Sequence, residues 1–304
     1  MRFANLDGRL TLVLGALDDP LDGAPGADVH AASGGAIPAD PALALAMWDE
    51  VVAWSHTPSQ AAAVTIKRER LRAPSPRPAQ IFGIGVNYAD HGAEAAMEIP
   101  EVPLVFPKLT TAIAGPFDAI TLTGATVDWE VEIAVVIGAR AHHVVASEAW
   151  DVVAGLTVGQ DLSDREIQWR PKSTPQFSLG KSLAGFAPLG PLLVTPDDFA
   201  DRDDIGLSCH LNGEEVQRST SAQMLLSIAE LIAYLSAIVD LLPGDVIFTG
   251  TPSGIGMTRT PPRYLVAGDR LDSRVDGVGT MSHTFVSALP QREAARASST
   301  KEDG

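Results

Sequence analysis

The chain has 304 residues, of which 45% are hydrophobic and 20% charged, and this composition excludes a fibrous or wholly disordered protein. Its 38 acidic and 22 basic residues give a formal net charge of −16, which argues against nucleic acid or an anionic membrane surface as a partner. A single cysteine, Cys209, excludes an internal disulfide bond. No stretch approaches the roughly 18 consecutive apolar residues of a membrane span, and no secretory cleavage pattern follows the first apolar run. We therefore expect a soluble, cytoplasmic protein.

The first predicted element is a hairpin, because the strands Arg2–Leu6 and Arg9–Leu14 flank the turn dipeptide Asp7-Gly8. Residues 18–40 are rich in Asp, Gly, Pro and Ala and are predicted to be irregular.

A helix is predicted next. Asp40 and Pro41 form a typical helix start, and apolar residues at helical spacing continue to about residue 54. Three prolines within residues 72–79 then indicate a boundary. We predict a small N-terminal domain over residues 1–76 and a catalytic domain over residues 77–289.

The larger body is predicted to consist mainly of β-strands. Asn212-Gly213 and Asp276-Gly277 are the turns of two expected hairpins. A short helix is expected from Ser147 to near Gly155, and a longer one begins at Ser221 with an apolar stripe that ends at Leu235. Residues 290–304 are polar and predicted to be disordered. The expected strands outside the last hairpin are 81–86, 127–137, 156–161, 207–211, 214–217 and 245–249.

Three acidic residues lie close together in Asp128-Trp129-Glu130-Val131-Glu132. Side chains alternate along a strand, so the three carboxylates are predicted to share one face, about 7 Å apart. Like charges at that distance repel by roughly 2 kcal/mol per pair at an effective dielectric constant near 20. Either this face is exposed at a strand end or it holds a cation, and Asp161 at the end of another apolar strand favours the cation. All-oxygen ligands suit Mg²⁺ or Mn²⁺ better than Zn²⁺.

A second cluster contains His91 and Glu94, three residues apart. On one helical turn they share a face, and the carboxylate would raise the basicity of the imidazole, so that the pair could activate water. The alternative is a surface histidine beside a surface glutamate. Glycines nearby indicate a mobile loop that could close over a site. We expect residues 87–100 to be open or poorly ordered when the site is empty.

Two further segments place polar groups in apolar surroundings. Lys181 precedes the apolar run Phe186–Pro191, and it either lays its alkyl chain along the surface or holds an anionic substrate or enolate. Residues 249–256 follow a predicted strand and expose backbone donors and hydroxyl groups, unless they form only a glycine-rich turn.

Together these segments make the chain similar to the fumarylacetoacetate hydrolase family between about Ile81 and Val286. The resemblance implies an α+β, mainly β fold with a mixed β-roll core, a homodimer, and one Mg²⁺ or Mn²⁺ per subunit. The segments that carry it are Gly85-Val86-Asn87-Tyr88-Ala89-Asp90-His91, Asp128–Glu132, Lys181-Ser182 with Phe186–Pro191, and Pro243–Pro252.

The resemblance also implies roles for single residues. The metal ligands would be Glu130, Glu132 and Asp161, whereas Asp128 is not a ligand in the family's pattern. His91 and Glu94 match a catalytic dyad on the family's lid, and Lys181 matches the cation that stabilises an enolate. Residues 95–100 and 261–264 look most like the branch of diketo sugar-acid hydrolases and ureidoglycolate lyase-like proteins. The residues implied to contact the substrate are Tyr88, Arg165, Gln168, Gly250 and Thr251.

We therefore predict a metal-dependent hydrolase that cleaves a C–C bond in an acylpyruvate-like 2,4-diketo acid, giving pyruvate and a carboxylic acid. Its expected partner is a small anionic 2-oxo acid. An oxaloacetate-type decarboxylase is the alternative, because it needs the same chelate but no attacking water, and lyases, isomerases and hydratases share the site. From another class, the acidic cluster would be a structural Ca²⁺ site in a non-catalytic protein.

Overall fold

The computed structural model describes residues 1–15, 21–56, 63–94 and 99–288, and the tail predicted over residues 290–304 lies outside them. Three sheets contain the strands of the described chain. The first has β1 (Arg2–Leu6), β2 (Arg9–Val13), β3 (Pro25–Asp28), β4 (Ala63–Thr65), β5 (Leu71–Arg72), β6 (Ile81–Gly85), β7 (Leu104–Pro107), β8 (Ile113–Ala114), β11 (Val131–Ile137), β12 (Val153–Gln160), β14 (Ala187–Val194) and β17 (Val246–Phe248). The second has β9 (Ile120–Leu122), β15 (Gly206–Leu211), β16 (Glu214–Thr220), β18 (Arg270–Val275) and β19 (Gly279–Ser287). The third has β10 (Val127–Asp128) and β13 (Ser163–Asp164).

Short helices surround these sheets. None of the helices in the described ranges is long and apolar enough to cross a membrane. The α-helices are α1 (Val29–Ala32), α2 (Pro41–Leu45), α3 (Trp48–Ser55), α4 (Ala89–Glu94), α5 (Arg165–Gln168), α6 (Phe177–Gly180) and α7 (Ile228–Ser236).

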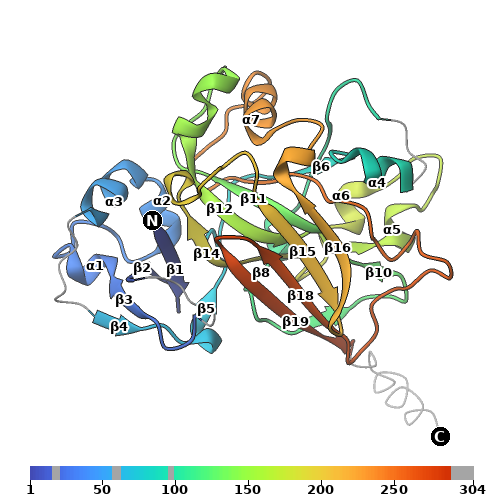
Figure 1. Cartoon of the computed structure of the whole chain (residues 1–304), viewed down its shortest axis with the longest axis horizontal. Helices are drawn as coiled ribbons and strands as arrows, with labels where there is room; N and C mark the ends of the chain where they lie inside the picture. Colours follow the sequence, from blue (N-terminus) through green and yellow to red (C-terminus); the bar gives the residue numbers. More distant parts are fainter. Residues whose placement is uncertain (16–20, 57–62, 95–98, 289–304) are drawn as a thin grey trace, which may run out of the picture.

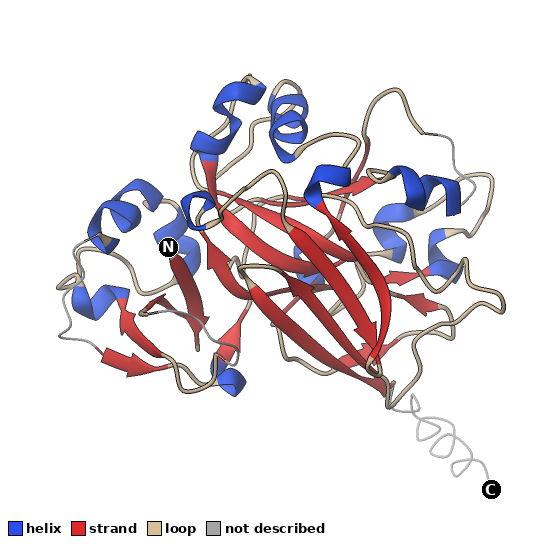
Figure 2. Cartoon of the chain, in the orientation of Figure 1, coloured by secondary structure: helices blue, strands red, loops and turns tan. Residues whose placement is uncertain are grey.

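The two larger sheets pack face to face and make the body of the molecule (Figures 1 and 2). The first has the order β4-β3-β2-β1-β14-β12-β11-β17-β6-β7, and the second has the order β16-β15-β18-β19-β9. Both parallel and antiparallel pairs occur in each sheet. This arrangement confirms the predicted α+β, mainly β fold with a mixed β-roll core.

The strands of the N-terminal region extend the first sheet, because β1 pairs antiparallel with β14. Its predicted hairpin is confirmed: Asp7 and Gly8 both have positive φ between β1 and β2. The other two predicted hairpins join β15 to β16 and β18 to β19. The prediction that residues 18–40 are irregular is wrong in part, since β3 and α1 lie within them. The domain boundary near residue 76 remains a prediction.

The long strand predicted over residues 127–137 is instead two strands, and side chains explain the break. The Asp128 carboxylate accepts a hydrogen bond from the Trp129 N–H at 2.9 Å, and the Gln160 side-chain oxygen accepts one from the Glu130 N–H at 2.9 Å. These bonds replace ladder partners between β10 and β11. Glu130 therefore lies between the two strands, outside both, and its side chain belongs to the candidate site described below.

Three helix predictions also differ from the structure. The helix predicted from Asp40 is split into α2 and α3 by a turn at residues 46–47. The segment predicted as a helix from Ser147 is a 3₁₀ helix over Ala146–Val152, and β12 follows it directly. The helix predicted from Ser221 begins only after Ser227, which forms a capping box with Glu230. Residues 225 and 226 are held out of that helix because their N–H groups bind Asn87.

A buried histidine makes fold stability depend on pH. His283 on β19 is 1% exposed and donates from Nε2 to the Gly115 carbonyl at 3.1 Å, whereas its Nδ1 has no partner. Burial lowers the pKa of His283 to about 4, from about 6.5 in the unfolded chain. The unfolded state therefore binds the proton first as the pH falls.

We expect His283 to remove about 3 kcal/mol from the free energy of unfolding as the pH falls from about 6.5 to 4, and nothing above that range. Urea unfolding of the wild type and of His283→Gln across this range measures it. The variant keeps a donor for Gly115 but does not titrate, so the difference between the two curves isolates His283. Parallel curves would contradict the expectation.

Candidate active site

Three buried carboxylates converge where β11 begins and β12 ends. The two strands pair with Val131 opposite Gln160, and the Asp161 N–H donates to the Glu130 carbonyl at 2.9 Å. One carboxylate oxygen from each of Glu130, Glu132 and Asp161 lies within 4.8 Å of the others, and each residue is at most 5% exposed. The cluster foreseen from the sequence therefore exists as one compact site.

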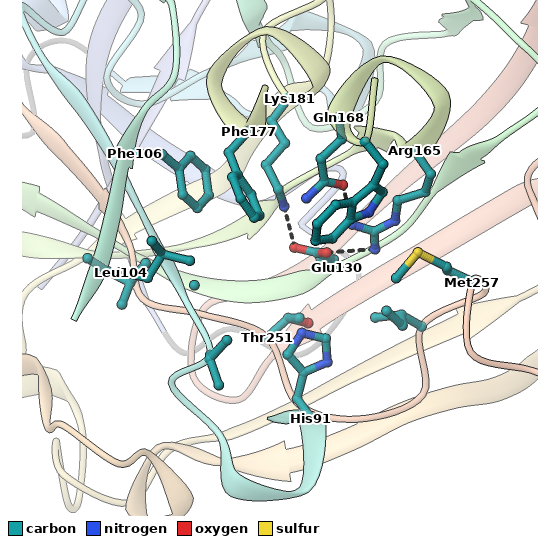
Figure 3. A pocket seen from close by; sticks show the side chains of 15 residues that line it. His91, Leu104, Phe106, Glu130, Arg165, Gln168, Phe177, Lys181, Thr251 and Met257 are labelled. Carbon is teal, nitrogen blue, oxygen red and sulfur yellow. Dashed lines mark hydrogen bonds and ion pairs between the residues drawn. The ribbon is translucent and has the colours of Figure 1, made fainter. Parts of the chain in front are cut away.

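Buried cations surround this cluster. Lys181 Nζ lies 2.6 Å from Glu130 Oε2 and 2.6 Å from Asp161 Oδ2. Arg165 Nη2 lies 2.7 Å from Glu130 Oε1, so Glu130 sits between the two cations (Figure 3). A second lysine, Lys108, contacts the other oxygen of Asp161. Charges taken out of water are tolerated only when they are paired in this way.

Asp128 shares Arg165 with Glu130 but lies outside the cluster of three carboxylates. Its carboxylate contacts Arg165 at 2.8 Å and accepts the N–H groups of Gly256 and Met257 at 2.7 and 3.0 Å. Asp128 therefore anchors Arg165 and the loop that follows β17, rather than joining the cluster.

The carboxylates of the cluster differ in acidity. Burial together with the negative charges of Asp161 and Glu130 raises the pKa of Glu132 well above its ordinary value. Burial would also raise the pKa of Glu130, but the positive charges of Lys181 and Arg165 outweigh it, and the net pKa is lowered. Burial lowers the pKa of Lys108, whereas the pKa of Lys181 is raised because Asp161 and Glu130 outweigh its burial. Glu132 is thus the carboxylate whose negative charge is least offset by neighbouring cations.

This donor set fits a hard divalent cation. All three groups are carboxylates and they approach one another closely. In the described part of the chain Glu132 forms no ion pair, and its Oε2 accepts the Gly250 N–H at 2.7 Å. Oxygen ligands of this kind suit Mg²⁺ or Mn²⁺.

A pocket opens onto Glu130 and Lys181. Phe106 stacks on Phe177 at 5.9 Å between ring centroids, and Trp169 meets Phe177 edge-on at 5.4 Å, so one wall is aromatic. The lining residues are Ile84, Gly85, Val86, His91, Leu104, Phe106, Glu130, Arg165, Gln168, Trp169, Phe177, Lys181, Thr251, Ile255 and Met257. The pocket thus combines an apolar wall with a charged floor.

His91 enters this pocket from α4, on the side opposite Lys181 (Figure 3). Its Nδ1 lies 3.9 Å from Glu94 Oε2, which is longer than a hydrogen bond, and no other described residue binds it. Glu94 instead accepts the Gly254 N–H at 3.0 Å. Burial would raise the pKa of Glu94, but His91 and this N–H lower it. The structure therefore places the two predicted residues near each other, but their side chains are too far apart for a hydrogen bond.

The start of α4 is fixed by Asn87. Its amide donates to the carbonyls of Leu226 and Thr249 at 3.0 and 2.8 Å, and its oxygen accepts the Leu226 N–H at 2.9 Å. Residues 95–98, within the predicted lid, lie outside the described residues. The expected opening of this segment in the absence of ligand remains a prediction.

The residues implied to contact substrate divide into two groups. Arg165, Gln168 and Thr251 line the pocket. Tyr88 and Gly250 are not among its lining residues: Tyr88 is fully buried, and Gly250, at φ 100°, points its N–H at Glu132. Their contact with substrate remains a prediction, and the structure gives Gly250 a part in holding the acidic cluster.

Sequence reasoning missed Lys108 and the aromatic wall. Lys108 follows the apolar strand β7, so it carries the same signal, a lone lysine beside an apolar run, that singled out Lys181. Trp169 directly follows α5 and Phe177 begins α6, two short helices with no periodic pattern, and no signal in the sequence marks either residue.

Comparison with known proteins identifies the family. The pattern described as fumarylacetoacetate (FAA) hydrolase C-terminal matches residues 80–286. The chain belongs to the fumarylacetoacetate hydrolase family. The resemblance seen in the sequence is thus confirmed.

Three members of this family illustrate its range. The mitochondrial oxaloacetate tautomerase Fahd2a of Rattus norvegicus is 43% identical over 216 residues, 70% of this chain and 68% of the relative. A crystal structure from Mycobacterium smegmatis, of a protein provisionally named HpcE, is 44% identical, with TM-score 0.88 over 95% of this chain and 100% of the other. The maleylpyruvate hydrolase of Sphingobium sp. SYK-6, solved with manganese(II) and pyruvate, is 28% identical, with TM-score 0.76 over 95% and 100%.

Replacing Glu132 tests the acidic cluster directly. Glu132→Gln keeps the acceptor for Gly250 but removes one charged ligand, so we expect Mn²⁺ affinity to fall by at least tenfold. The unfolding temperature without metal should stay equal or rise, because repulsion from Glu130 and Asp161 is relieved. Isothermal titration and thermal unfolding measure the two effects, with exposed Glu148→Gln as the control. Unchanged Mn²⁺ affinity would refute the cluster as a metal site.

Proposed function

We propose that this chain is a divalent-metal-dependent enzyme that moves a proton between the enol and keto forms of a small 2-oxo acid, with oxaloacetate as the substrate. The observation that carries this proposal is a single pocket in which Glu130, from the carboxylate cluster, and Lys181 lie opposite His91, whose Nδ1 has no hydrogen-bond partner among the described residues. The relative from Rattus norvegicus, named an oxaloacetate tautomerase, supports it. The manganese and pyruvate in the Sphingobium structure support a metal and a 2-oxo acid at such a site.

The binding step uses the charged floor of the pocket. A divalent ion held by Glu130, Glu132 and Asp161 would polarise the 2-oxo group and stabilise negative charge on its oxygen. The Lys181 ammonium lies beside the same carboxylates and adds positive charge at that oxygen. Arg165 is held by Asp128 and Glu130 and by the Gln168 side-chain oxygen at 2.8 Å, so it stiffens the floor.

The proton step uses His91. The imidazole faces the floor from α4, and its Nδ1 has no hydrogen-bond partner within the described ranges, so this nitrogen is available to the substrate. In the direction from enol to keto, the enol oxygen loses a proton and C3 gains one, while the C2=C3 double bond becomes single and the C2–O bond becomes a carbonyl, so that no two heavy atoms are joined or separated. This reaction needs a proton carrier but no oriented water. That requirement suits a histidine whose carboxylate neighbour lies 3.9 Å away.

Hydrolysis of an acylpyruvate, the reaction favoured by the sequence alone, is the second candidate. The aromatic wall of Phe106, Phe177 and Trp169 supports it, because an apolar acyl group would pack there. In that reaction His91, oriented by Glu94 after a small movement, would draw a proton from water that attacks the distal carbonyl. Oxaloacetate decarboxylation uses the same floor without water.

Several accompanying expectations remain predictions. We propose Mg²⁺ or Mn²⁺ as the metal on the basis of the all-carboxylate donor set. The homodimer, the 2-oxo-acid partner and the cytoplasmic location are likewise predictions made from the sequence.

The proposal is tested by following enol-oxaloacetate by absorbance and pyruvate by a coupled assay. We expect metal-dependent loss of the enol without pyruvate. His91→Asn should lower kcat/KM by at least about 100-fold, which is the usual contribution of a general acid–base group. Exposed His142→Asn is the control.

Other products would identify the alternatives. Pyruvate from oxaloacetate indicates decarboxylation, and pyruvate from a panel of acylpyruvates indicates hydrolysis. Glu94→Gln separates these further, because hydrolysis should suffer more than tautomerisation. Metal binding with no turnover of any of these substrates would reject the enzyme proposal and favour a structural ion.

A further inference from the structure

Lys108 is a buried lysine beside the acidic cluster that takes no part in the proposed reaction. It follows the edge strand β7. Its backbone N–H donates to the Ile81 carbonyl at 2.9 Å, so its backbone is hydrogen-bonded to the first sheet. Its side chain is 0% exposed. Lys108 is absent from the lining of the pocket.

The ammonium of Lys108 has no donor left for a ligand. It contacts Asp161 Oδ1 and the carbonyl oxygens of Lys181 and Phe186, the last at 3.1 Å. These are three acceptors for the three N–H groups of a lysine. Lys181 differs, because it lines the pocket and its ammonium contacts two carboxylates and the face of the Phe106 ring rather than backbone carbonyls. The two lysines that share Asp161 thus have separate tasks.

The contacts of Lys108 determine where Asp161 and Lys181 lie. Oδ1 of Asp161 is held by Lys108, so Oδ2 is the oxygen turned to Lys181. The two carbonyl contacts hold the backbone of residues 181–186. Next to Lys108, the Leu109 N–H donates to the Ser182 hydroxyl at 2.9 Å and strengthens the same junction.

We propose that Lys108 is a positioning residue that orients Asp161 toward the metal and sets the place of Lys181. The proposal rests on the proposed metal site but not on which reaction follows. The two possible roles of Lys108 predict opposite effects of its removal on metal affinity. As a charge, Lys108 repels a cation and its removal should tighten metal binding. As a positioning group, its removal should weaken binding, because partners that orient ligands typically contribute 10–100-fold to metal affinity.

The experiment measures Mn²⁺ binding by electron paramagnetic resonance of the free ion, with no substrate present. The variants are Lys108→Met and Lys108→Gln, and exposed Lys67→Met is the matched control. Both Lys108 variants lose the charge, but glutamine keeps a donor for a carbonyl. We expect affinity to fall about tenfold or more in Lys108→Met, less in Lys108→Gln, and not at all in the control.

Equal or tighter Mn²⁺ binding in both variants would show that Lys108 acts only as a charge. If Lys108→Met does not fold, Lys108→Gln alone decides, since weaker binding supports positioning and tighter binding overturns it. A wild type that binds no Mn²⁺ overturns the proposed function as well, whereas a binding wild type with unaffected variants overturns this inference alone.

Discussion

The site depends on burying carboxylates beside enough positive charge to keep them there. Glu130, Glu132, Asp161 and Asp128 are all at most 5% exposed, and removing a carboxylate from water costs several kcal/mol. Three cations offset them, each supplied by a different part of the chain: Lys108 after β7, Arg165 on α5 and Lys181 after α6. The fold has to bring these distant segments together before the acidic strand can be buried.

Neutral side chains complete this arrangement and connect it to the second sheet. Gln160 accepts the Glu130 N–H and donates to Ser273 Oγ on β18 at 2.9 Å. Gln217 on β16 accepts the Val131 N–H at 3.0 Å and donates to Thr251 Oγ1 at 2.8 Å. These hydrogen bonds fix the start of β11 against the five-stranded sheet, which also packs on the hydrophobic core.

Local patterns in the sequence predicted the features that have local causes. Turn dipeptides predicted the three hairpins, and the alternation along Asp128–Glu132, with Asp161, predicted the acidic cluster. Features decided by distant partners were missed. The helix expected from Ser221 starts late because Asn87 binds residues 225 and 226, and Lys108 gains its place only through Asp161 and two carbonyls. Periodicity does not encode such contacts.

The pairing of β1 with β14 has a consequence for the integrity of the chain. Arg2 and Phe3 cover the backbone of Val194 and Leu193, which are at most 2% exposed. In a fragment starting at residue 77, the backbone N–H and C=O groups of Leu193 and Val194 would form an unpaired sheet edge, to which strands of other molecules could pair. The first strand therefore protects this edge of β14, and we expect residues 77–288 alone to expose it, even though all the residues of the candidate site lie within that range.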